Sequence, residues 1–170
     1  MNIFQNRGNN KRLLGTILIC TFSCLVTPPV RAQLVKEKAN CRDYSPELTP
    51  KFKVVRRTDA KAKSSLQLFI TVSAKDGTRD RLIALSCELA KEYATKDSVY
   101  VWIFNNKRAA KVFRPLRNGN DYATDRAYLG MYGFSRVPES FFDSSLTWEP
   151  DPGSLREVYI DLGPPPQRQN

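Results

Sequence analysis

The pattern of hydrophobic and polar residues divides residues 66–104 into a strand, a helix and a second strand. Residues 66–72 (LQLFITV) are rich in β-branched and aromatic side chains, which is typical of a β-strand. In residues 78–95 apolar side chains recur every three or four positions, and this spacing predicts an amphipathic helix. Residues 98–104 (SVYVWIF) are apolar on both alternations, which predicts a strand that is covered on both faces of its sheet.

This order of elements predicts a βαβ unit, in which the two strands lie parallel and the crossover is right-handed. A second, short helix is expected directly afterwards, because Asn105 or Asn106 can cap its first turn and Pro115 stops it. The side chains expected to face inward from this helix are Ala109, Ala110 and Phe113.

Additional strands are predicted on both sides of this unit. They are residues 51–57, 127–136, 145–150 and 157–162. Residues 127–136 (AYLGMYGFSR) alternate, and their glycines permit a bulge or the close approach of a neighbouring backbone. We therefore predict an α+β fold, a βαβ unit extended by antiparallel strands into one mixed sheet, with one main helix and one short helix packed on it.

Composition predicts four segments along the chain. They are a signal peptide (residues 1–32), an extended N-terminal arm (residues 33–50), a single α+β domain (residues 51–162) and a disordered Pro-rich tail (residues 163–170). The leader has a basic start, an apolar centre and small side chains before a cleavage point near Ala32, which is typical of secretory signal peptides. The sequence therefore predicts an exported protein, either periplasmic or secreted.

The apolar centre of the leader, residues 13–26, is shorter than the roughly 20 residues that span a bilayer as a helix. We therefore expect no transmembrane helix in the mature chain. An uncleaved membrane anchor and lipid attachment at Cys24 stay open as alternatives.

The chain is basic, with 27 Lys and Arg residues against 17 Asp and Glu residues. Four of the basic residues lie in the predicted leader, so residues 33–170 keep 23 basic and 17 acidic residues and a formal charge of +6. A moderate positive charge favours contact with anionic surfaces. It is not a specific signal for nucleic acid.

Two cysteines remain beyond the predicted leader, Cys41 and Cys87. An even pair of cysteines in an exported chain favours one disulfide bond. Two buried thiols are the alternative, because Cys87 falls on the apolar side of the predicted helix.

The chain contains no histidine, which excludes Ser–His–Asp and Cys–His nucleophile systems and zinc sites that use imidazole. The sequence also has no CxxC pair, no GxGxxG and no Walker loop. Asp143, Glu149 and Asp151 do not have the spacing of a calcium loop. We therefore predict no metal site and no cofactor. These absences favour a protein without enzymatic activity, and paired carboxylates that act on a glycosidic bond stay open as an alternative.

Aromatic side chains are concentrated in the C-terminal strands. They are Tyr122, Tyr128, Tyr132, Phe134 and Trp148, with Arg126 and Arg136 nearby. Such residues either form part of a core or make a stacking surface for bases or sugars.

The segments that follow the two parallel strands form the predicted site. The carboxyl ends of parallel strands meet at one edge of a sheet, and each of these segments begins a helix, whose free N–H groups favour an anion. The predicted ligand-binding residues are Lys75, Thr78, Arg79, Asn105, Asn106, Lys107 and Arg108, and Lys111, Arg114 and Arg117 extend the same charge. Ordinary capped helix starts with solvated side chains are the alternative.

Three classes of function are compatible with these features. The first is a non-enzymatic exported protein that contacts an anionic component of the cell envelope. The second is a hydrolase that uses carboxylates, tyrosines and arginines without histidine. The third is a structural protein that pairs with another exported protein through a sheet edge.

Overall fold

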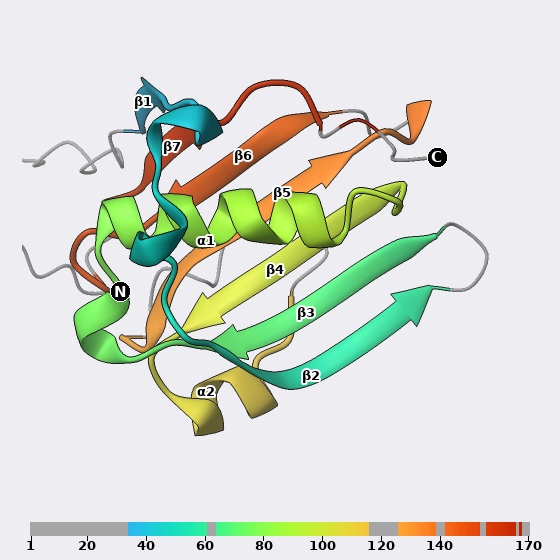
Figure 1. Ribbon diagram of the computed structural model, residues 1–170. Helices are drawn as coiled ribbons and strands as arrows, with labels where there is room; N and C mark the ends of the chain where they lie inside the picture. Colours follow the sequence, from blue (N-terminus) through green and yellow to red (C-terminus); the bar gives the residue numbers. More distant parts are fainter. Residues whose placement is uncertain are drawn as a thin grey trace, which may run out of the picture. The chain divides into compact units, whose positions relative to one another are not determined.

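Seven strands form one mixed sheet in the computed structural model of the chain (Figure 1). The structure describes residues 34–60, 64–115, 126–138, 142–153, 156–165 and 167, all within the unit Arg31–Asn170. The predicted signal peptide and part of the predicted tail therefore lie outside the described residues.

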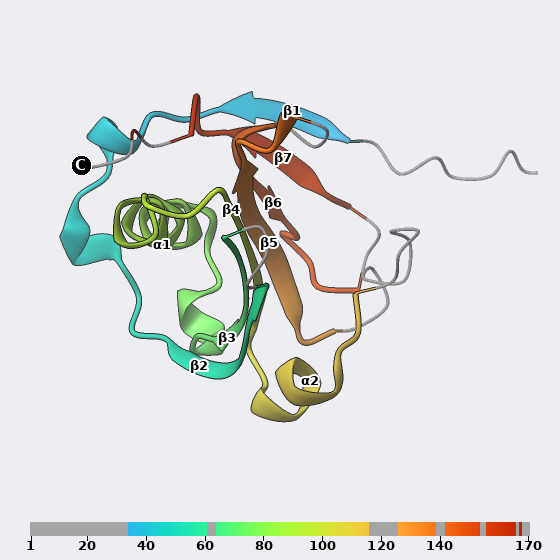
Figure 2. The same ribbon diagram turned by 90° about the vertical axis from the view of Figure 1, so that its right-hand side faces the viewer.

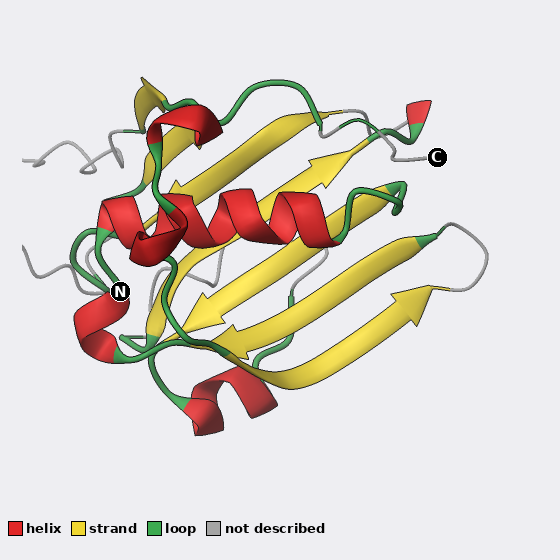
Figure 3. Cartoon of the chain, viewed as in Figure 1, coloured by secondary structure: helices red, strands yellow, loops and turns green. Residues whose placement is uncertain are grey.

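The strands follow the chain as β1 (Val35–Lys38), β2 (Lys53–Ala60), β3 (Ser65–Thr71), β4 (Ser98–Phe104), β5 (Tyr128–Ser135), β6 (Phe142–Trp148) and β7 (Val158–Asp161). In the sheet they lie in the order β1-β7-β6-β5-β4-β3-β2 (Figure 3). The pairs β1–β7 and β3–β4 are parallel, and the other neighbouring pairs are antiparallel. The predicted mixed sheet is confirmed.

The main helix, α1 (Arg79–Glu92), packs on one face of the sheet, and the short helix, α2 (Lys107–Val112), packs on the other (Figure 2). Three single-turn 3-10 helices complete the described secondary structure. They are η1 (Cys41–Asp43), η2 (Pro46–Leu48) and η4 (Ala74–Asp76). The predicted α+β fold with one main and one short helix is therefore confirmed.

Strands β3 and β4 and helix α1 form the predicted βαβ unit. The two strands are parallel and in register from Ser65↔Ser98 to Thr71↔Phe104. The pairing continues one residue beyond β3, where the Val72 N–H donates to the Phe104 carbonyl oxygen over 2.9 Å. The carboxyl ends of both strands therefore lie side by side at one end of the sheet.

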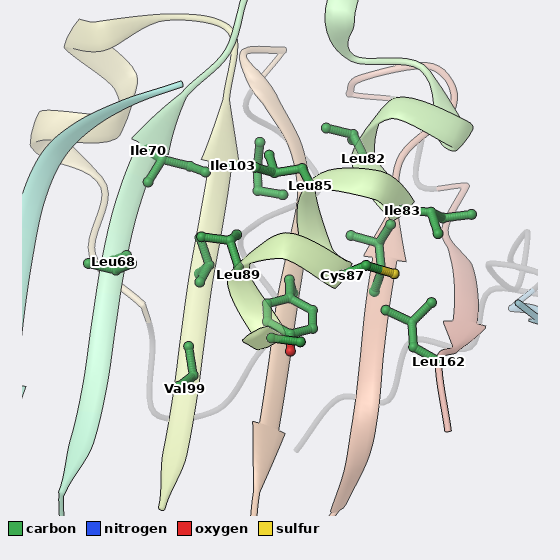
Figure 4. Packing of buried hydrophobic residues seen from close by; sticks show 14 of the residues in the cluster. Leu68, Ile70, Leu82, Ile83, Leu85, Cys87, Leu89, Val99, Ile103 and Leu162 are labelled. Atoms are coloured by element: carbon green, nitrogen blue, oxygen red, sulfur yellow. The ribbon is translucent and has the colours of Figure 1, made fainter. Parts of the chain in front are cut away.

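The apolar stripe of α1 forms the larger core. Leu82, Leu85 and Leu89 recur at helical spacing, have no exposed surface and face the sheet (Figure 4). Burying one such side chain stabilises the fold by about 1.5–3 kcal/mol. The helix therefore fixes which alternation of each strand faces it, for example Val99 and Ile103 of β4.

The opposite alternation of the same strands forms a smaller, aromatic core under α2. Phe69 of β3 and Trp102 of β4 stack with their ring centroids 4.8 Å apart, and Phe104 and Tyr128 join them. Ala110 of α2 is completely buried against this cluster. Strand β4 is thus covered on both faces, which explains why its sequence is apolar on both alternations.

Gly130 allows β5 and β6 to approach each other closely. Its φ of +155° is unfavourable for residues with a side chain, and a Cβ atom there would lie 2.2 Å from the carbonyl oxygen of Thr147. The glycines of residues 127–136 suggested the close approach of a neighbouring backbone, and Gly130 permits such an approach.

The segment before β2 joins the sheet, which the sequence pattern did not indicate. Its short strand β1 pairs in parallel with β7, and the Ala39 N–H donates to the Asp161 carbonyl oxygen over 2.9 Å. The predicted disulfide between Cys41 and Cys87 is confirmed, with the two Cα atoms 5.5 Å apart. Strand pairing and the disulfide thus fasten this segment at two points.

Candidate functional site

The seven predicted ligand-binding residues do not form a single surface. Thr78, Arg79 and Asn105 line one depression beside the start of α1. Asn106, Lys107 and Arg108 lie at the start of α2, which packs against the other face of the sheet. Lys75, on η4, is exposed and does not line the depression.

The predicted residues are separated onto two faces of the sheet because side chains alternate in direction at the end of β4. Phe104 points into the aromatic core under α2, so Asn105 points to the α1 side. Asn106 then turns the chain into α2, and its side-chain oxygen accepts hydrogen bonds from the backbone N–H groups of Arg108 and Ala109 over 2.8 and 3.3 Å. Asn106 is therefore the helix cap, one of the two candidates, Asn105 and Asn106, that the sequence offered for this role.

The depression beside α1 has a volume of about 940 Å³. Its floor includes Leu129 and the half-buried ring of Trp148, whose indole N–H donates to the carbonyl oxygen of Gly77 over 3.2 Å. Glu149, which is buried and also lines the depression, accepts a hydrogen bond from the N–H of Gly153 over 3.3 Å. Trp148 and Glu149 both come from the end of β6, far from the predicted site in the sequence.

The charges around the depression are mostly neutralised within the protein. Arg79 bonds to the carboxylate of Glu37 over 2.6 and 2.8 Å and to that of Asp80 over 2.8 Å. The hydrogen bond to Glu37 raises the pKa of Arg79 above its ordinary value. Beside the depression, Arg81 pairs with the mostly buried carboxylate of Asp76 over 3.0 Å. Both arginines at the start of α1 are therefore paired with carboxylates, and Lys75 is the basic side chain of this segment without an ion pair to a described residue.

A second group of charges, the basic surface, lies on the α2 side. It consists of Lys53 and Arg56 of β2, Lys107, Arg108 and Lys111 of α2, and Arg114 just beyond α2. Between the described residues, no ion pair joins any of these six side chains to a carboxylate. Arg117, which was predicted to extend this charge, lies outside the described residues. Most of the positive charge that remains available near the ends of β3 and β4 therefore lies on the basic surface.

Strand register places β2 in the basic surface. Lys53 pairs with Thr71, and Arg56 pairs with Phe69 of the aromatic core under α2. Residues directly opposite each other in a sheet share a face, so both basic side chains lie on the α2 side. The sequence alone contained no signal for their proximity to α2, because they lie some 50 residues before that helix.

Arg56 connects β2 to the carboxyl end of α2. Its guanidinium lies 3.5 Å from the ring centre of Phe69 and donates to the carbonyl oxygens of Phe113 and Lys111 over 2.8 and 3.4 Å. The guanidinium of Arg114 also donates to the Phe113 carbonyl oxygen, over 3.1 Å. Burial, together with the charge of Arg114, lowers the pKa of Arg56. Two cations thus converge at the end of one short helix.

The aromatic residues of the C-terminal strands serve mainly as core. Tyr128, Tyr132 and Phe134 are buried, and the Tyr132 hydroxyl accepts a hydrogen bond from Ser144 over 3.2 Å. Burial raises the pKa of Tyr132 above its ordinary value. Trp148 lines the depression beside α1, and Tyr122 lies outside the described residues.

In the described part of the chain, no group of three or more acidic or cysteine side chains could hold a metal ion. No helix there is long and apolar enough to cross a membrane. No protein-family model, curated protein or solved structure matches this chain.

Proposed function

We propose that this protein is an exported, non-catalytic binding protein that contacts an anionic component of the cell envelope through the basic surface. The single observation that carries the proposal is the set of six basic side chains without a carboxylate partner among the described residues. Charges that are not neutralised within a fold remain available to attract an opposite charge from outside.

Export is supported by two features. The first 32 residues have the order of a secretory leader, and the disulfide Cys41–Cys87 is typical of proteins in oxidising compartments.

The hydrolase alternative gains little support from the depression beside α1. A catalytic acid or base must be free to exchange a proton with a substrate. Glu37 and Asp80 are engaged by Arg79, Asp76 is engaged by Arg81, and Glu149 accepts a backbone N–H. These carboxylates therefore serve the fold.

The edge-pairing alternative is weakened by the nature of both sheet edges. Strand β2 has a bulge between Val54 and Arg56 and carries charged side chains, and β1 is only four residues long with two exposed lysines. Bulges, short length and charge are the features that protect natural sheet edges from pairing with another chain.

Binding to an immobilised polyanion tests the proposal. The protein should be retained on a dextran sulfate matrix at low salt and released as salt rises, because screening weakens exposed charge interactions. The triple variant Lys107→Glu, Arg108→Glu, Lys111→Glu should elute at distinctly lower salt than the wild type.

A matched control changes the same net charge elsewhere. Lys36→Glu, Lys38→Glu, Arg42→Glu alters three exposed side chains on or next to β1, at the opposite edge of the sheet. This variant should elute close to the wild type. Equal losses in the two triple variants would indicate a general charge effect and would contradict the proposed surface.

A further inference from the structure

The outer face of α2 combines positive charge with an exposed apolar side chain. Residues four apart lie on the same side of a helix, so Lys107 lies next to Lys111, and Arg108 lies next to Val112. Val112 is 61% exposed, the largest fraction among the exposed large hydrophobic side chains of the described residues. The valine therefore stands beside cations, on the side of α2 that faces away from the sheet.

The inner side of α2 holds this face in a fixed orientation. Ala110 is completely buried, and the ring of Phe113 lies 5.1 Å from that of Phe104 and 6.2 Å from that of Tyr128. Asn106 caps the start of the helix, and Arg56 donates to carbonyl oxygens at its end. The helix is therefore a rigid support for its outer side chains.

The two guanidinium groups at the carboxyl end of α2 favour an anion between or beside them. Arg56 and Arg114 both donate to the carbonyl oxygen of Phe113, over 2.8 and 3.1 Å, so two positive charges lie close together. An external phosphate group would offset their repulsion, and guanidinium groups bind phosphate oxygens well.

A soluble polyanion would use the cations but would gain nothing from Val112. A bilayer with anionic headgroups uses both, because basic side chains meet the phosphates while apolar side chains enter the interface. The combination therefore favours a lipid surface over a soluble or wall-bound polymer.

We propose that the outer face of α2 docks on a bilayer that contains anionic phospholipids, with the basic surface at the headgroups and Val112 in the interface. This inference rests on the proposed function and names its partner.

Vesicle co-sedimentation tests the docking. The protein, purified in the form in which it is exported, is mixed with phosphatidylcholine vesicles that either contain or lack phosphatidylglycerol. The wild type should bind the anionic vesicles more strongly, and binding to the neutral vesicles measures any contribution that does not depend on charge. Each basic side chain that is removed should weaken binding about fivefold, so Lys107→Gln, Arg108→Gln, Lys111→Gln together should weaken it roughly a hundredfold.

Val112→Ser separates a bilayer from a polyanion. It should weaken binding to the anionic vesicles several-fold and leave the salt needed for elution from dextran sulfate unchanged, because only the bilayer receives the valine. The matched control is Val54→Ser, which changes a 48% exposed valine paired with Ile70 on the α1 side of the sheet. This control should change neither binding measurement, and both serine variants should remain folded at the temperature of the binding assays, as circular dichroism checks.

The failures of the two proposals are distinguishable. Retention on dextran sulfate without a preference for anionic vesicles would overturn the lipid docking and leave the proposed function standing. A Val112→Ser variant that binds anionic vesicles as well as the wild type does would also overturn it. Failure to bind either probe would overturn both proposals.

Discussion

The starts of α1 and α2 occupy corresponding places, each beyond the carboxyl end of one of two parallel strands, yet their charges differ. At α1, Arg79 is held by Glu37 and Asp80. At α2, Lys107 and Arg108 form no ion pair with any described residue. The comparison teaches that the edge of a parallel sheet does not by itself determine an anion site, because the segments packed beside each helix decide whether its cations remain free.

The two helices also differ in how much of the fold depends on them. Eight of the 14 residues of α1 are buried, against one of the six residues of α2. The segment before β2 is bonded to α1 through the disulfide, while the outer face of α2 carries only exposed side chains. We therefore expect changes near α1 to affect stability, and changes on the outside of α2 to affect binding.

The largest effect should come from removing the disulfide, which lies on the α1 side alone. The double variant Cys41→Ala, Cys87→Ala should lower the free energy of unfolding by about 3–4 kcal/mol, because the bond closes a loop of about 46 residues and restricts the unfolded chain. Urea denaturation, followed by circular dichroism, measures this loss.

Reduction of the wild type with dithiothreitol should reproduce most of the loss, and the double variant itself should not respond to dithiothreitol. Under conditions in which the double variant is folded, its retention on dextran sulfate should equal that of the wild type. A folded variant that no longer binds would show that the α1 and α2 sides are not independent.

A smaller effect on the free energy of unfolding is expected when one arginine at the start of each helix is replaced. Arg79→Gln removes the bonds to Glu37, Asp80 and Tyr44 and should lower the free energy of unfolding by roughly 1 kcal/mol, a modest value because the side chains of Arg79 and Glu37 are 31% and 34% exposed. The matched variant Arg108→Gln should leave the free energy of unfolding within about 0.5 kcal/mol of the wild type, because its side chain is exposed. Equal losses in urea denaturation would contradict this difference between the helices.

The smallest effect should be a pH dependence of the free energy of unfolding that arises on the edge strand β2. The hydrogen bond from Arg57 lowers the pKa of Asp59, so the native state favours the charged carboxylate. Its contribution to stability is complete above the pKa of the unfolded chain, near 3.9, and is lost as the pH falls through the lower native value. The difference in free energy of unfolding between the wild type and Asp59→Asn should therefore be small at neutral pH and should shrink further below about pH 4.

A control for this measurement is Asp143→Asn, which removes one carboxylate from an exposed position of β6. Urea denaturation at several pH values provides both comparisons. A difference between the wild type and Asp59→Asn that grows toward acid pH would contradict the expected direction of this dependence.

Most of the fold could be predicted because its signals are local. The helix from residue 79 and the strands around it follow from hydrophobic spacing, and the parallel pairing of β3 and β4 follows from their order with one helix between them. Strand β1 was missed because VKEK has no hydrophobic alternation, and its place in the sheet depends on backbone bonds to β7. Strand β2 extends three residues beyond the predicted end at residue 57, because its ladder with β3 continues through polar positions.

The candidate site was less predictable because it combines residues that are distant in the sequence. Asn105 and Asn106 are neighbours, yet one lines the depression and the other caps α2 on the opposite face. Arg56 joins the basic surface through a register with β3 that no local pattern reveals. Glu37 neutralises Arg79 only because β1 lies beside α1.

The sequence by itself determined the alternation of each central strand, the apolar stripe of the main helix and the net positive charge, because each of these depends on residue type and spacing along the chain. Only the tertiary structure decided which of those charges meet a carboxylate. Ion pairing requires two side chains within a few ångströms of each other, and that distance is set by the packing of segments far apart in the chain. The positive charge is therefore neutralised at the start of α1 and remains available on the outer face of α2.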